Sequence, residues 1–179
     1  MLIPVILLAL VGGYIFFYNR FMKMNNLARE AWSGIEVQLK RRQDLIPQLV
    51  NVVKGYTTHE QKVFADVIDR RNRARQSTTI KERQNNENDF SLGIKELFAL
   101  VENYPELKAD TQFTKLQENL TDVENDIQNA RRYYNATVRE FNTALHSIPS
   151  SWVGASMNFR DKAFFEMKES EPREMNIKF

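Results

Sequence analysis

The sequence predicts an all-α protein, an antiparallel bundle of long helices preceded by one N-terminal transmembrane helix. Three observations lead to this fold class. An uncharged apolar stretch, residues 2–18, opens the chain. A heptad pattern of apolar residues runs through residues 110–149 for five repeats. The rest of the chain contains few glycines and prolines and many Leu, Glu, Lys, Arg, Gln and Asn residues, which favours helices over strands.

The first stretch is long enough to cross a membrane. At the helical rise, residues 2–18 span about 26 Å, slightly less than a hydrocarbon core of about 30 Å. The alternative is a cleaved secretory signal, but no Lys or Arg precedes the apolar run. Cysteine is absent, which excludes a lipid-modified cysteine terminus. We therefore expect a retained anchor that contacts membrane lipid through residues 2–18, with its terminal aromatic residues at the interface.

The charges beside this stretch predict its orientation. Arg20, Lys23 and Arg29 follow closely, whereas only the terminal amine lies on the other side. By the positive-inside tendency, the N-terminus lies outside and the bundle lies in the cytoplasm.

Three segments are expected along the chain: an anchor at 1–19, a helical bundle at 20–149, and a C-terminal tail at 150–179. The first bundle helix runs from about Phe21 to Gly55. Pro47 lies inside its apolar pattern and predicts a kink near residues 44–47, because proline removes one backbone hydrogen bond.

Gly55 is typical of a helix C-cap, and Thr57 with Glu60 has the spacing of a capping box. These residues predict the start of a second helix. The polar run 84–89 has no apolar residue and predicts a loop. A shorter helix over about 91–103 then ends before Pro105.

The last helix carries the strongest periodic signal, which would make it about 55 Å long. Asp110 or Thr111 can cap its start, and Pro149 marks its end. Its apolar seam consists of Phe113, Leu116, Leu120, Val123, Ile127, Ala130, Tyr134, Thr137, Phe141, Ala144 and Ile148. Beyond it the tail carries Phe159, Phe164 and Phe165, and two alternatives stay open: it packs along the bundle through these rings or remains loose.

Several sequence blocks resemble the LemA family, in order and over nearly the whole body. They are residues 32–42 (WSGIEVQLKRR), 44–47 (DLIP), 59–60 (HE), 104–109 (YPELKA), 116–117 (LQ), 130–135 (ARRYYN) and 141–142 (FN), with a looser match at 164–166 and Phe179. The resemblance implies a single-pass protein of the bacterial cytoplasmic (inner) membrane with a bundle of long helices. It implies no enzymatic activity and no catalytic residues.

Catalytic and metal-binding patterns are not found. His59 and Glu60 begin like a zinc-binding His-Glu-x-x-His helix, but Val63 occupies the position of the second ligand. The sequence also contains no Gly-rich phosphate loop, no nucleophile elbow and no recognisable Ser–His–Asp set. We therefore expect no enzyme, no metal and no cofactor.

Two polar groups are candidates for contacts. Arg70, Arg71, Arg73 and Arg75 form a basic cluster that could contact anionic lipid or an acidic partner, or could be a solvated face with weak salt bridges. Nucleic acid is not expected, because the segment lacks aromatic stacking partners.

Arg131, Tyr134 and Asn135 are expected to form a polar cluster in the bundle, with a ligand pocket as the alternative. The basic run 40–42 is expected to pair with acids at positions 122, 124 and 126 of the last helix, with contact to lipid as the alternative.

The function that follows is an interaction or scaffold module at the membrane, which docks an unidentified protein partner or self-associates. The alternative is a bundle that senses a small ligand and is coupled to the span through the first helix, with a pocket near Pro47 and Tyr134.

Overall fold

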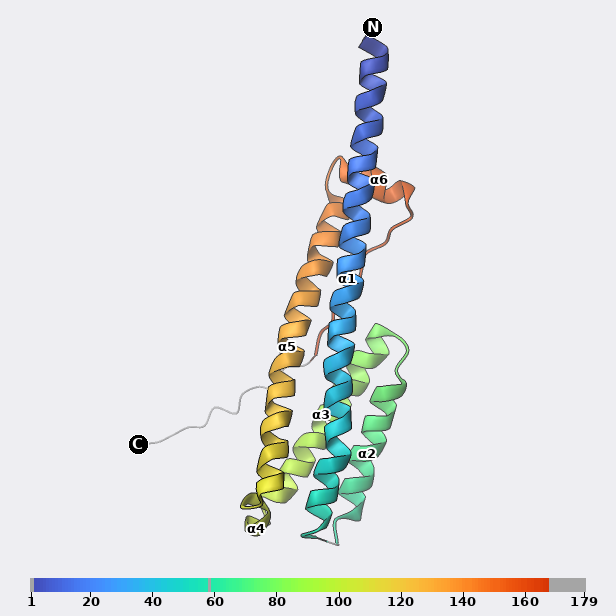
Figure 1. Ribbon diagram of the computed structural model, residues 1–179. Helices are drawn as coiled ribbons and strands as arrows, with labels where there is room; N and C mark the ends of the chain where they lie inside the picture. The colour runs from blue at the N-terminus through green and yellow to red at the C-terminus, as the bar shows by residue number, and fades with distance from the viewer. Residues whose placement is uncertain (1, 58, 168–179) are drawn as a thin grey trace, which may run out of the picture.

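The computed structural model describes residues 2–57 and 59–167 of the 179-residue chain. The described residues form helices and no strand, which confirms the all-α class (Figure 1). The helices are α1 (Leu2–Lys54), α2 (Gln61–Gln76), α3 (Ile80–Val101), α4 (Pro105–Lys108), α5 (Thr111–His146) and α6 (Ser150–Ser156). Figure 1 shows α1 and α5 side by side and antiparallel, with the α2–α3 hairpin at the end far from the N-terminus.

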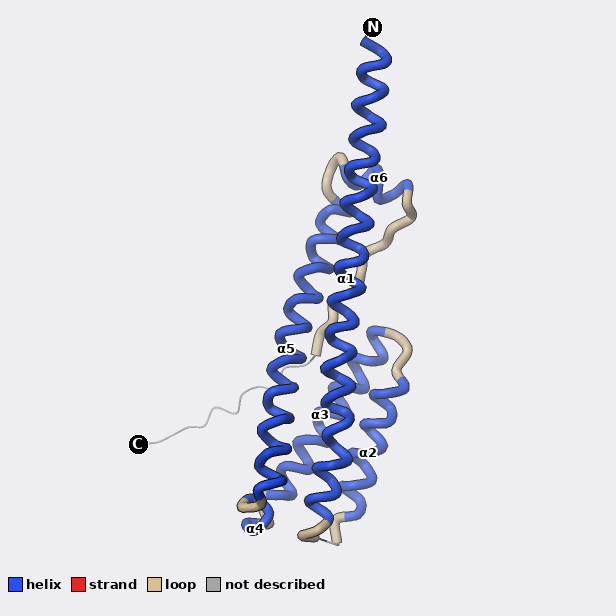
Figure 2. Tube along the Cα trace, viewed as in Figure 1, coloured by secondary structure: helices blue, strands red, loops and turns tan. Residues whose placement is uncertain are grey.

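The anchor and the first bundle helix are one continuous helix. α1 has 53 residues and does not stop at the boundary expected near residue 19. At the helical rise it is about 80 Å long. Residues 44–47 are helical, so α1 continues through Pro47 without a break, and the kink expected there stays a prediction (Figure 2).

A contact from α2 explains how the helix passes this proline. Pro47 has no N–H to donate to the carbonyl of Gln43, one helical turn earlier. Arg71 supplies the missing donor, because its Nε lies 2.5 Å from that carbonyl oxygen. Arg71 belongs to the basic cluster of the sequence, and its side chain donates a hydrogen bond to a backbone carbonyl of another helix.

The seam of α5 packs against α1 as its periodicity predicts. Most of its apolar positions are buried, Ile127 and Phe141 almost completely. Asp110 caps the helix by accepting hydrogen bonds from the backbone N–H groups of Gln112 and Phe113. Ile148 departs from the pattern, because α5 ends at His146 and leaves that side chain 77% exposed.

The α2–α3 hairpin corrects two expectations. Residues 84–89 are helical and belong to α3, which begins at Ile80 after the N-cap Thr79, whose side chain accepts from the backbone N–H of Glu82. The connecting loop is therefore residues 77–79. The capping box before α2 is also absent, since the N-cap Glu60 makes no side-chain cap hydrogen bond and the hydroxyl of Thr57 pairs with that of Tyr104 at 3.0 Å.

The C-terminal segment packs along the bundle as far as it is described. After α6, residues 157–167 run back beside α1 and α5 (Figure 1). Phe165 is fully buried and its ring contacts that of Trp32, 5.3 Å between centroids. This supports the first of the two alternatives for the tail, while Phe179 lies outside the described residues.

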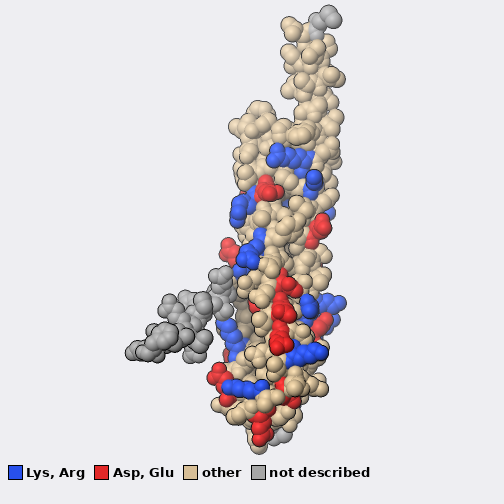
Figure 3. Space-filling model, turned by 60° about the vertical axis from the view of Figure 1, so that its left-hand side comes forward, with Lys and Arg blue, Asp and Glu red and all other residues tan. Residues whose placement is uncertain are grey.

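The first turns of α1 project beyond the other helices. The apolar side chains between residues 2 and 11 are more than half exposed, and no Lys, Arg, Asp or Glu precedes Arg20. Figure 3 shows this projection without charged atoms, whereas the body below it carries charges of both signs. Among the described helices, α1 alone is long and apolar enough to cross a membrane.

Candidate functional site: a groove between α3 and α5

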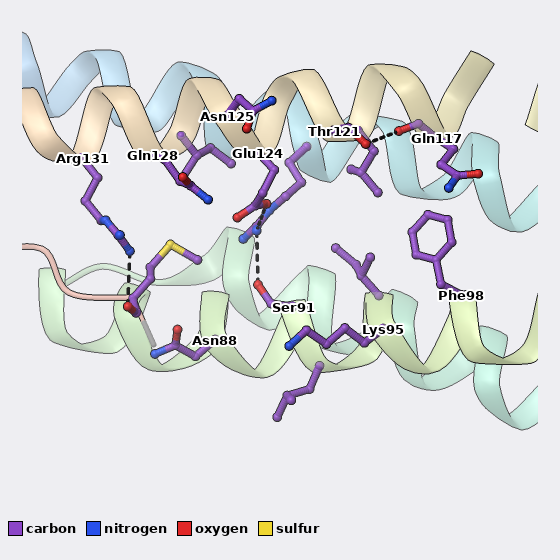
Figure 4. Close-up of a pocket in the computed structure, with 16 residues that line it drawn as sticks. Asn88, Ser91, Lys95, Phe98, Gln117, Thr121, Glu124, Asn125, Gln128 and Arg131 are labelled. Carbon is purple, nitrogen blue, oxygen red and sulfur yellow. Dashed lines mark hydrogen bonds and ion pairs between the residues drawn. The ribbon is translucent and has the colours of Figure 1, made fainter. Parts of the chain in front are cut away.

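A groove of about 790 Å³ separates α3 from α5. Figure 4 shows Asn88, Ser91 and Lys95 of α3 facing Glu124 and Gln128 of α5 across it. Arg131 lies at one end of the groove, and Phe98 and Gln117 lie at the other (Figure 4). The lining mixes apolar side chains from the bundle core with amides and charges, and it is open to solvent along one side.

Arg42 of α1 forms the floor of the groove. Its side chain is 1% exposed, although it is charged. One guanidinium nitrogen, Nη1, donates to Glu124 Oε2 at 2.9 Å and to Ser91 Oγ at 3.2 Å. The other, Nη2, pairs with the carboxylate of Glu87. One side chain of α1 therefore connects α3 and α5 beneath the groove.

Glu87 is the fully buried acid that compensates Arg42. Its second oxygen accepts from Gln43 Nε2 at 2.6 Å, so both carboxylate oxygens have donors. A buried ion pair is tolerated only when its remaining polar groups are satisfied, because desolvation of two charges costs several kcal/mol. Arg42 Nε is the exception here, with no hydrogen-bond partner. The backbone carbonyl of Gln43 also accepts a hydrogen bond from Arg71 of α2. Glu87 of α3 and Arg71 of α2 are thus both bonded to α1, and the network holds the α2–α3 hairpin on that helix.

The expected pairing of the basic run 40–42 with α5 is confirmed for Arg41 and Arg42. Besides the Arg42–Glu124 pair, Arg41 lies 3.5 Å from Asp126 at the surface. Exposed pairs of this kind contribute little, about 0–1 kcal/mol. The fully buried pair of Arg42 with Glu87 is therefore the one that fixes the arrangement of the helices.

The polar cluster of α5 holds the C-terminal segment. Tyr134 donates to the carbonyl of Ala163 at 2.9 Å, and burial raises the pKa of this phenol, so it stays a neutral donor. The amide of Asn135 forms two bonds with the backbone of Phe165, at 2.9 and 3.0 Å. Arg131 donates to the carbonyl of Met167 at 3.2 Å, and Met167 is part of the wall of the groove.

The basic cluster of α2 lies away from the groove. Arg70, Arg71 and Arg73 form ion pairs with acids on α1, α2 and α3, whereas Arg75 is exposed. The paired acids are Asp44, Asp66, Asp69, Asp89 and Glu96. These pairs neutralise much of the positive charge of the cluster, and its contact with lipid or an acidic partner stays a prediction.

Sequence reasoning missed Glu87, the residue that organises the site. The polar run 84–89 predicts a loop at this position. Glu87 nevertheless continues the spacing of the buried positions of α3. Glu87, Phe90, Ile94, Leu97 and Val101 follow steps of three and four residues and are all buried. A charge on a buried helical seam indicates a buried partner, so this periodicity was the available signal.

The groove offers binding groups and no recognisable catalytic set. No group of three or more His, Cys, Asp or Glu side chains within the described ranges could hold a metal ion. Among the described residues that line the groove, the one carboxylate is that of Glu124, and it is engaged by Arg42. What remains accessible is the ammonium of Lys95, the amides, and apolar surface such as Leu92, which is 53% exposed.

Comparisons with known proteins agree with the sequence blocks. Residues 31–179 match the model of the LemA family. Magnetosome protein MamQ of Magnetospirillum gryphiswaldense is 21% identical over 90% of this chain and 69% of its own length. Magnetosome protein MamQ 2 of Paramagnetospirillum magneticum is 20% identical over 89% of this chain and 68% of its own. Protein LemA of Metamycoplasma hominis is 23% identical over 90% of this chain and 76% of its own.

Proposed function

Because the chain belongs to the LemA family, we propose that this membrane-anchored bundle is an interaction or scaffold module that acts by binding and not by catalysis. Its docking surface is the α3–α5 groove, and its partner is a protein segment with apolar side chains and acidic groups. The single observation that carries the proposal is the groove itself, a large open surface over a rigid buried network.

The chemistry of the groove favours such a segment. Lys95 is exposed on α3, and Arg131 lies at one end on α5. Arg42 is shared by Glu87 and Glu124, so these three groups carry one net negative charge, and Lys95 and Arg131 bring the described groups of the groove to one net positive charge beside exposed apolar atoms. Apolar contact contributes affinity, and complementary charge contributes orientation and association rate.

Site-specific crosslinking in cells tests this proposal. A photo-crosslinking residue at Gln128, in the groove wall, should capture a protein that the same residue at Lys62 on α2 does not capture. Lys95→Glu should abolish the capture, and Lys62→Glu, with the same charge change outside the groove, should retain it. A homodimer at Gln128 would identify self-association as the interaction. Equal labelling from both positions would contradict the proposed site.

We further propose that the protein is a single-pass protein of the bacterial cytoplasmic membrane, with the bundle inside the cell. The basic residues Arg20, Lys23 and Arg29 beside the apolar segment support this orientation. Since the chain has no native cysteine, Asn103→Cys at the far end of the body gives a clean reporter. A membrane-impermeant maleimide should label it only after permeabilisation; labelling of intact cells would place the bundle outside.

Ligand sensing is the second candidate, and one observation favours it. The groove volume lies within the range of about 300–1,000 Å³ typical of small-molecule sites. The groove is not lined by Pro47 or Tyr134, where the pocket was expected, but its floor is Arg42 of the helix that carries the apolar segment. A metabolite that raises the melting temperature of the wild type, and not of Lys95→Glu, would favour this function over protein docking.

A further inference from the structure

The end of the body nearest the N-terminus has an uncharged surface, which we call the crown and define as residues 147–159. These thirteen residues contain no Lys, Arg, Asp or Glu. Two large apolar side chains of the crown face solvent, Ile148 at 77% exposure and Trp152 at 71%. Figure 3 shows this end of the body without charged atoms, and the first charges appear below it. The feature is unusual because other long apolar side chains of the body are mostly buried.

The crown is fixed against the apolar part of α1. The hydroxyls of Tyr14 and Ser156 are hydrogen-bonded at 3.2 Å, and Gly154 lies against the ring of Phe21. A Cβ at position 154 would approach that ring to 3.2 Å and Leu145 to 2.6 Å, so glycine permits this close packing. Below it the rings of Phe21, Phe141 and Phe159 contact one another edge to face or tilted. The level of the crown on α1 is therefore set by side-chain contacts.

This level overlaps the apolar segment. Tyr14, which bonds Ser156 of the crown, lies within the uncharged stretch of α1, and the first charged side chain of the helix is Arg20. The crown therefore lies beside residues 14–18, the last turns of the apolar segment. If α1 crosses the bilayer with this segment in lipid, the crown lies at the same level as these turns.

We propose that the crown is a second membrane contact: it lies in the lipid interface beside the anchor, with Ile148 and Trp152 inserted among the upper acyl chains. Its composition suits that position, because tryptophan is favoured at membrane interfaces and no charge has to be desolvated. Polar side chains begin just outside the crown, where His146 and Asp161 are hydrogen-bonded at 2.8 Å. The inference rests on α1 being membrane-inserted, and it is independent of which protein the groove binds.

Fluorescence quenching in vesicles of brominated phosphatidylcholine tests the proposal with the full chain. The protein has two tryptophans, so Trp32→Phe leaves Trp152 as the reporter and Trp152→Phe leaves Trp32 as the matched control. Trp32 lies about 21 Å along α1 beyond Tyr18, out of reach of the lipid. Lipid brominated near the headgroup should reduce Trp152 emission about two-fold, more than lipid brominated near the chain ends does, and leave Trp32 unchanged.

Two results would overturn the crown contact. Quenching of Trp152 by aqueous iodide without quenching by either lipid would show that it faces water. A blue-shifted emission that neither lipid nor iodide quenches would show that protein, such as a second copy, covers it. A third reporter, Leu8→Trp in a chain with both native tryptophans replaced by phenylalanine, checks the anchor. Quenching of this reporter without quenching of Trp152 rejects the crown alone, and quenching of neither rejects membrane insertion itself.

Because Trp32 is partly buried against the core, its substitution could disturb the fold, so a second measurement avoids it. Trp152→Cys carries the only thiol of the chain and can be labelled with a nitroxide. In vesicles, the label should be more accessible to oxygen than to a water-soluble nickel complex. The crown contact would be contradicted if the label at position 152 were more accessible to the nickel complex than to oxygen. The same label in Leu8→Cys should be more accessible to oxygen, as expected for lipid.

Discussion

The sharpest test of the fold concerns how α1 passes Pro47. The proline leaves the carbonyl of Gln43 without its intrahelical donor, and Arg71 Nε supplies one at 2.5 Å. The side chain of Arg71 is only 14% exposed, so water replaces this donor poorly. A hydrogen bond from a charged donor contributes about 1.5–3 kcal/mol, and we expect Arg71→Met to lower the free energy of unfolding by about 2 kcal/mol.

Pro47→Ala gives the matched background. Alanine restores the backbone N–H, which can donate to Gln43 as in any α-helix. In that background Arg71→Met should cost about 1 kcal/mol or less, because the carbonyl keeps a partner without the arginine. The double-mutant cycle should therefore show a coupling energy of at least about 1 kcal/mol between the two positions.

Urea unfolding of the four proteins in one detergent, followed by circular dichroism, measures this coupling. Retained helicity at zero urea is the control that each variant folds, and equal m-values are required for the comparison. If the two substitutions add within about 0.5 kcal/mol, Arg71 does not compensate for the proline. The role of α2 in supporting α1 would then have to be reassigned to its apolar contacts.

Three further predictions use the same unfolding measurement. Glu87→Gln should cost about 3 kcal/mol because it leaves Arg42 buried with the half-exposed Glu124 as its remaining anionic partner; a variant as stable as the parent would show that the pair is not buried in solution. Ile127→Asp or Leu120→Asp should unfold the bundle, since each places a charge on the buried seam of α5 at a cost of several kcal/mol, and a parental melting curve would refute the seam. Hydrogen bonds from Tyr56 and from the first backbone N–H groups of α5 hold the pKa of Asp110 below its ordinary value. Its contribution is thus present at neutral pH and lost as the pH falls below about 4, so Asp110→Asn should lose less stability than the parent over that interval in thermal melts at matched pH.

Periodicity made the long helices predictable, and local composition misled where tertiary contacts decide. The α5 seam was assigned correctly because many buried positions repeat the same spacing, and single exceptions do not erase such a signal. The proline of α1 predicted a kink, and the sequence does not show that Arg71, 28 residues beyond Gln43, donates to the carbonyl that the proline leaves without its donor. Residues 84–89 predicted a loop because they are polar, although Glu87 is buried through its pairing with Arg42. Both cases involve a polar group whose partner belongs to another helix.

The groove was only partly predictable for the same reason. The pairing of Arg42 with Glu124 followed from complementary charges on two long helices, but Ser91 and Lys95 belong to a helix whose start was misplaced. Tyr134 and Asn135 were identified as a polar cluster from their residue types. Their contacts are carbonyls and amides of the C-terminal segment, and backbone groups leave no trace in the sequence.

The continuity of α1 sets the distance between the membrane and the groove. From Tyr18, at the end of the apolar segment, to Arg42, at the floor of the groove, the helix rises about 36 Å. The packing of α5 along α1 stiffens the intervening turns, so this spacing is held by two helices. A membrane protein that binds in the groove must therefore extend well beyond the lipid headgroups. If the crown rests in the interface, it also restricts how far the bundle can tilt, because tilting would pull Trp152 out of the lipid. The two membrane contacts and the rigid helix together would hold the groove at one height and one orientation, which is the geometric requirement for a docking platform.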